Sequence, residues 1–171
     1  LPAGVPVTTE QWPAVTRLLV LGLAGLAEVA GLDELAQATA ACCRTATSAG
    51  DVEKFWKQVQ PVVEEYVLVD EPSEEHFRAA RTIAAAIPES TFRNPSVRIE
   101  MWRLRNRQPE DASQFQAQLL ALARTANAIG DADLQRECVE LVDTVCPEDL
   151  RLDTTMRMVE ALGTTASARH T

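Results

Sequence analysis

Aromatic side chains are scarce in this sequence: they make up 5% of its 171 residues. Apolar residues of all kinds make up 46%, and alanine and leucine dominate them. Alanine favours helices and leaves the faces of a sheet poorly packed. The composition therefore predicts an all-α protein, and its 24% charged residues are typical of a folded chain and not of a disordered one.

The sequence also lacks the common catalytic motifs. It has no glycine-rich phosphate loop, no Gly-x-Ser-x-Gly and no Cys-x-x-Cys. His76 is the only histidine inside a predicted helix, and its acidic neighbours favour a solvent-facing or capping role over a general base. We therefore expect no enzyme activity, no cofactor and no metal site.

The cysteines have no spacing that suits a metal or a local disulfide. Two are adjacent and two are eight residues apart, which on a helix separates them by about 12 Å. We expect reduced thiols in a protein core. The four residues are Cys42, Cys43, Cys138 and Cys146.

Long hydrophobic runs and a secretory signal are missing too. The longest apolar run, Leu18 to Leu32, is interrupted by Glu28 and is shorter than the roughly 20 residues that a bilayer span requires. We predict that it forms a buried central helix, and that the protein is cytoplasmic and binds no membrane. Because the sequence begins without methionine, we expect a processed chain or a segment of a longer protein.

Glycine, proline and acidic residues divide the chain into seven or eight helices. We predict an extended lead-in over residues 1–7, a single all-α domain over 8–163 and a disordered tail over 164–171. Expected caps and stops are Thr8 or Thr9, Gly31, Gly50-Asp51, Ser73, Asn94-Pro95, Gly130-Asp131 and Gly163, and Pro61 is expected to kink or split the third helix. Short turns make consecutive helices antiparallel neighbours. The fold class is a helical-hairpin bundle or a short α-solenoid.

One helical hairpin, Gln114 to Pro147, resembles a tetratricopeptide repeat. Leu122 and Ala123 stand where that family has Leu-Gly, Gly130-Asp131 lies at its turn, and Pro147 lies seventeen residues after the glycine. Gln135 departs from the pattern, because the family has alanine there. We interpret the likeness as shared hairpin geometry and not as membership of the family.

Positive charge gathers in one segment of an otherwise acidic chain. The net charge is −9, yet seven arginines face two glutamates between His76 and Gln108. In the predicted helix that ends at Arg107, an apolar stripe of Val97, Met101 and Leu104 would have Trp102 at its edge. The candidate partner-binding residues are Arg93, Arg98, Trp102, Arg103, Arg105 and Arg107.

Three interpretations of this segment remain open. It forms a surface for an acidic protein or for another copy of the chain; or it holds the phosphates of a nucleic acid while Phe92 or Trp102 stacks on bases; or its arginines pair with acidic helices of the same chain. We expect a non-catalytic protein-protein interaction or assembly module, with a protein partner or self-association. The alternative is a packaging or nucleocapsid-type nucleic-acid-binding protein that uses residues 93–107.

Overall fold

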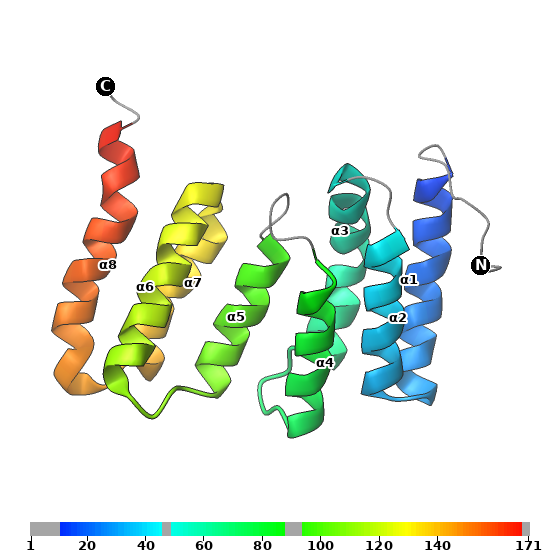
Figure 1. Cartoon of the computed structure of the whole chain (residues 1–171), viewed down its shortest axis with the longest axis horizontal. Coiled ribbons are helices and arrows are strands. Elements are labelled where there is room, and N and C mark those ends of the chain that lie inside the picture. The colour runs from blue at the N-terminus through cyan, green and yellow to red at the C-terminus, as the bar shows by residue number, and fades with distance from the viewer. Residues whose placement is uncertain (1–10, 46–48, 88–93, 169–171) are drawn as a thin grey trace. The chain divides into compact units, whose positions relative to one another are not determined.

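The chain folds as a series of helices. The computed structural model describes residues 11–45, 49–87 and 94–168, and in these residues it contains eight α-helices and no strand (Figure 1). The all-α prediction is confirmed, and the helices pack as sequential hairpins. They are α1 (Trp12–Val29), α2 (Leu32–Thr45), α3 (Ala49–Tyr66), α4 (Glu74–Ala85), α5 (Asn94–Asn106), α6 (Ala112–Ile129), α7 (Ala132–Val145) and α8 (Glu148–Ala168).

Contacts divide the chain into two compact units, unit 1 (Leu1–Pro95) and unit 2 (Ser96–Thr171). In both units, helices that are two apart in the chain pack together, as they do in stacked hairpins: α1 with α3, α2 with α4, and α6 with α8. The single-domain boundaries 8–163 stay a prediction. The lead-in and the caps Thr8 and Thr9 lie outside the described residues.

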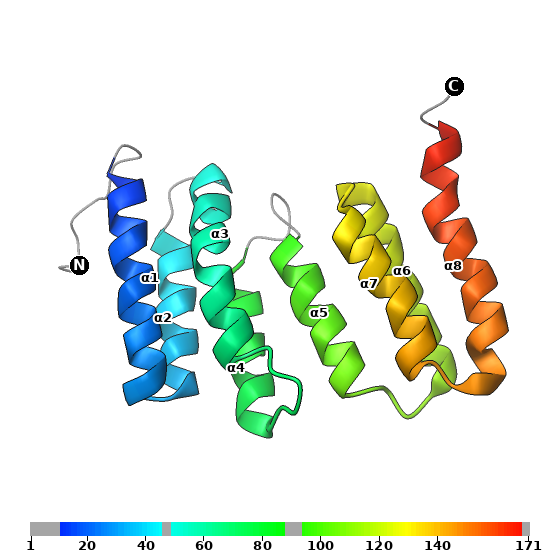
Figure 2. The same ribbon diagram turned by 180° about the vertical axis from the view of Figure 1, so that it is seen from behind.

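Unit 1 has two layers of helices. Figures 1 and 2 show α1 and α3 on one side and α2 and α4 on the other. Polar contacts link the helices within each layer: the Tyr66 hydroxyl of α3 donates to Glu28 of α1 at 3.1 Å, and Arg78 of α4 donates to both Asp33 oxygens of α2 at 3.2 and 3.4 Å. The unit contains large, fully buried side chains, which include Phe55 and Trp56 of α3, Leu35 of α2 and Ile83 of α4.

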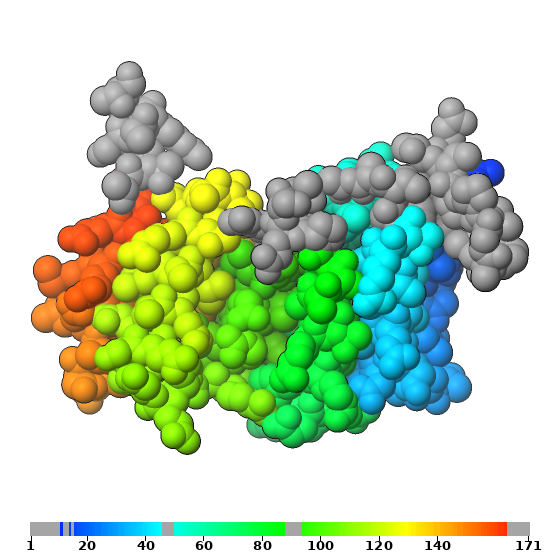
Figure 3. Space-filling view, in the orientation of Figure 1, coloured from blue at the N-terminus to red at the C-terminus, as the bar shows by residue number. Residues whose placement is uncertain are grey.

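Unit 2 is built around the α6–α7 hairpin. Its core takes residues from all four helices, and Phe115 of α6 is the largest fully buried side chain of that cluster. The other fully buried members include Leu119, Leu134 and Leu141, while α5 contributes Met101 and Leu104. Figure 3 shows α8 (orange to red) lying against α6 (yellow-green) on one face of this unit.

Several predicted caps are confirmed. Gly31 and Gly130 have positive φ angles, 106° and 78°, which glycine adopts without strain. The Asp131 carboxylate accepts from the backbone N–H groups of Asp133 and Leu134 at 3.1 and 3.2 Å, and so caps α7. Ser73 caps α4, and its N–H donates to Nδ1 of His76 at 3.1 Å in a capping box.

Three predicted breaks do not occur at the positions predicted for them. The expected stop at Gly50-Asp51 is wrong, because α3 begins at Ala49, where a first-turn aspartate suits the helix dipole. Pro61 lies inside α3, which continues past it, so the predicted split is wrong, whereas the predicted kink stays a prediction; a 2.8 Å hydrogen bond from Gln60 to Glu64 spans the proline. Gly163 does not end α8, which continues to Ala168, since this glycine has no positive φ. Of the disordered tail predicted over 164–171, residues 164–168 belong to α8, and 169–171 lie outside the described residues.

Candidate protein-interaction surfaces

The arginines predicted to bind a partner are only partly available. Arg98 lies 3.7 Å from Glu137 and links α5 to α7, and Arg103 donates to one Glu100 oxygen at 2.7 and 3.0 Å. Arg105 is exposed and pairs with no carboxylate in the described part of the chain. Exposed pairs of this kind contribute only about 0–1 kcal/mol each. A carboxylate of a partner could therefore replace Glu100 as the group that pairs with Arg103, at a low cost in free energy. Arg107 is also exposed, and Arg93 lies outside the described residues.

Trp102, predicted at the edge of the apolar stripe of α5, is itself buried. It is 6% exposed, and Ile99, three residues before it, is also buried. Together with Val97, Met101 and Leu104 these side chains bury α5 on more than one face. The indole ring is therefore not open to stacking in this structure. The three-residue spacing of Ile99 and Trp102 was the signal for this second buried face.

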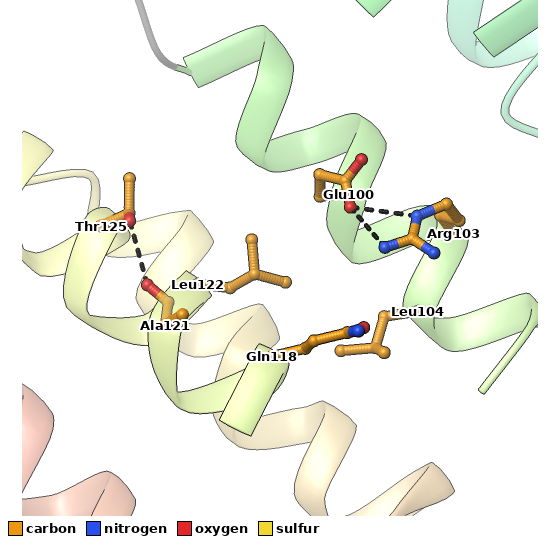
Figure 4. Close-up of a pocket in the computed structure, with 7 residues that line it drawn as sticks. All are labelled: Glu100, Arg103, Leu104, Gln118, Ala121, Leu122 and Thr125. Atoms are coloured by element: carbon orange, nitrogen blue, oxygen red, sulfur yellow. Dashed lines mark hydrogen bonds and ion pairs between the residues drawn. The ribbon is translucent and has the colours of Figure 1, made fainter. Parts of the chain in front are cut away.

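A pocket of about 220 Å³ lies between α5 and α6, within unit 2 (Figure 4). Its walls are Leu104 of α5 and Ala121 and Leu122 of α6, with the Glu100–Arg103 pair on its α5 side. Pockets for small ligands usually measure about 300–1,000 Å³. The size suits one side chain of a partner better than a cofactor.

Gln118 gives this pocket a polar feature. Its Oε1 atom is buried and accepts no hydrogen bond from any described residue. An unpaired buried acceptor costs about 1–3 kcal/mol, so an N–H or O–H donor that entered the pocket would remove a penalty as well as form a bond. Thr125 cannot supply this donor while its hydroxyl donates to the Ala121 carbonyl at 3.0 Å.

The outer face of α8 carries a row of large apolar side chains. Leu152, Met156 and Val159 are 62–75% exposed, and their spacing of four and three residues places them on one face. The opposite face buries Thr154 and Met158 against unit 2. Sequence analysis missed this row, although its helical spacing was the signal.

Polar contacts from α6 hold α8 in place, and one of them joins Gln116 to the buried Thr154 hydroxyl at 3.0 Å. Gln116 donates to Asp153 at 2.7 Å, and Asn127 donates to the Ala161 carbonyl at 3.2 Å. The hydrogen bond from Gln116, assisted by Arg157 at 3.0 Å, lowers the pKa of the Asp153 carboxyl. The row is therefore presented on a helix whose orientation is fixed.

The outer face of α1 carries a second such row. Leu18, Leu21 and Val29 are 67–88% exposed. A side chain added at Gly22 or Gly25 would meet no atom within 4 Å. The prediction of a buried central helix for Leu18 to Leu32 is therefore wrong. The run is apolar on all sides, so its periodicity does not indicate which side the neighbouring helices cover.

The remaining reactive side chains have structural surroundings. The four cysteines are free, and burial raises the pKa of Cys43 and Cys138 to about 12, which disfavours the thiolate. His76 is occupied in the α4 capping box. Across residues 11–45, 49–87 and 94–168, no three His, Cys, Asp or Glu side chains gather closely enough to hold a metal ion.

Neither hydropathy nor similarity assigns the chain to a known class. None of the described helices combines the length and the apolar character that a bilayer crossing needs. Comparisons with protein-family models, curated proteins and solved structures find no significant match. The resemblance of the α6–α7 hairpin to a tetratricopeptide repeat thus concerns one hairpin. Gln135, which stands where that family has alanine, donates through Nε2 to the Ala126 carbonyl at 3.5 Å.

Proposed function

We propose that the chain is a non-catalytic protein-interaction and assembly module. The observation that carries this proposal is the pair of exposed apolar rows, one on α1 and one on α8. Full burial of a leucine, methionine or valine side chain is worth about 1.5–3 kcal/mol. A row of three can therefore offset much of the cost of association.

The α5–α6 pocket supports the same proposal. It offers apolar walls, an unpaired acceptor on Gln118 and an exchangeable ion pair, which together suit an apolar side chain with a donor group. The nucleic-acid alternative has less support. It needs free arginines and an exposed ring, whereas Arg98 and Arg103 face carboxylates and Trp102 is buried.

The proposal is tested by site-specific photo-cross-linking in an extract of cells that express the full chain. A photoreactive residue at Met156 lies on the α8 row, and one at Asp143 is a control on an exposed site of α7. We expect discrete protein cross-links from position 156 and none from position 143. Leu152→Glu with Val159→Glu should remove them, because both substitutions place charge in the buried centre of the contact.

Two results would contradict this function. One is the absence of cross-links from position 156; the other is a pattern that is equal at both positions and unchanged by the glutamates. Circular dichroism of the double variant checks that α8 stays folded, since both substituted side chains point to solvent.

A further inference from the structure

The outer face of α1 has the same order of side-chain sizes from either end of the helix. Four residues of this face, Leu18, Gly22, Gly25 and Val29, follow at steps of four, three and four residues, as large, small, small and large side chains. These steps place all four on one helix face, and all four are exposed. If a second α1 ran antiparallel about a two-fold axis level with Leu23 and Ala24, Leu18 would oppose Val29 of the other copy. Gly22 would oppose Gly25.

The glycines allow two such helices to approach closely. No atom lies within 4 Å of a Cβ built at Gly22 or Gly25, so both positions are open notches. Packed helices lie 8–10 Å apart, and small residues at the crossing favour the lower end of that range. Leu21, which flanks the notches, is 67% exposed and would pack against Gly25 of the other copy.

The charges beside the row favour the antiparallel arrangement. Arg17 and Glu28 are eleven residues apart, which is three helical turns plus about 20°, so they border the row on the same side. In an antiparallel symmetric pair, each side of the row meets the same side of the other helix. Arg17 of each copy would then face Glu28 of the other. A parallel pair would place both charges beside apolar residues.

Both charged groups are placed for this contact. Arg17 is exposed and pairs with no described carboxylate, while Glu28 is exposed and accepts from the Tyr66 hydroxyl through Oε1. That hydrogen bond raises the pKa of Tyr66, because it stabilises the neutral phenol beside a carboxylate. It also holds the Glu28 side chain on the α3 side of α1.

We propose that the outer face of α1 is a homodimer interface, in which the same face of a second copy packs antiparallel against it. This inference rests on the proposed function and names the partner of one of its two rows. The contact is isologous, so it closes at two copies. Because it involves one 18-residue helix from each copy, its area lies at the low end of specific interfaces, and we expect a dissociation constant on the order of micromolar.

The test is sedimentation equilibrium of the full chain over concentrations that bracket the expected constant. We expect a monomer–dimer equilibrium. Arg17→Glu and Glu28→Arg should each weaken the dimer roughly tenfold, since each replaces two attractions by two repulsions. The double variant R17E/E28R should restore the affinity to within roughly threefold, because the charges are again complementary.

Three further variants separate the interface from general effects. Leu18→Glu with Val29→Glu should abolish the dimer. Lys54→Glu reverses an exposed charge on α3 and should leave it unchanged. Tyr66→Phe removes the hydrogen bond to Glu28 without changing charge and should alter the affinity less than Glu28→Arg does.

Each other outcome overturns the inference. A chain that stays monomeric has no such interface, and growth beyond two copies that persists in Leu18→Glu with Val29→Glu shows that association does not use the α1 row. Failure of R17E/E28R to restore affinity excludes the antiparallel contact. The proposed function is judged separately, by cross-linking at Met156 on α8, so one can fail without the other.

Discussion

Phe115→Ala is expected to lower the free energy of unfolding of unit 2 by about 3–5 kcal/mol, the usual cost of removing a buried aromatic ring. The ring is 1% exposed and lies in the core that α5, α6, α7 and α8 share. The measurement is urea unfolding followed by far-UV circular dichroism. Gln114→Ala, at the exposed neighbouring position, is the control and should change stability by less than about 0.5 kcal/mol. A cost below about 1 kcal/mol for Phe115→Ala would contradict the packing described for unit 2.

Trp56→Ala is expected to destabilise unit 1 by a similar amount, about 3–5 kcal/mol. Trp56 of α3 is the largest fully buried side chain among the described residues. Its Nε1 atom donates to no described acceptor, so the ring contributes through packing and not through a hydrogen bond.

Trp56→Phe is the matched control for that prediction. Phenylalanine keeps most of the buried ring and removes an unpaired donor, whose burial costs about 1–3 kcal/mol. We expect urea unfolding to show a loss less than half that of Trp56→Ala. If the two variants lost equal stability, Nε1 would have to form a bond that the structure does not contain.

The boundaries of the helices could be predicted where the signal is local. A glycine followed by an acidic residue ended one helix and capped the next at Gly130-Asp131, because the left-handed glycine and the capping carboxylate act within a few residues. The same dipeptide at Gly50-Asp51 lies inside α3. There the pattern failed because a glycine in the first turn of a helix needs no special φ angle.

Which face of a helix is covered could not be predicted from the local pattern. The residues of α1 are apolar on every side, and only the positions of α2 and α3 determine that Leu23 is buried while Leu18 is exposed. On α5, the second buried face with Ile99 and Trp102 was hidden by the arginines that flank those residues, Arg98 and Arg103. For this reason the structure favours the apolar rows of α1 and α8 as the candidate site, whereas the sequence favoured the arginines of α5.

The position of these rows follows from how each unit is stacked. Within unit 1, α1 packs on α2 and α3, and within unit 2, α8 packs on α6 and α7. Each helix thus buries one face and leaves the other uncovered. Leucine, methionine and valine at these positions are the reason to expect partners there.

The most direct measurement of the antiparallel α1 contact is cross-linking between chains that carry one new cysteine each. In a Cys42→Ser background, which removes the most accessible native thiol, one chain carries Leu18→Cys and the other Val29→Cys. With a short bismaleimide, an equimolar mixture should form a covalent dimer, whereas each chain alone should not. In an antiparallel pair, position 18 lies opposite position 29 and about 16 Å along the axis from its own counterpart. Cross-linking of the Leu18→Cys chain to itself, with none in the mixture beyond that level, would contradict the account.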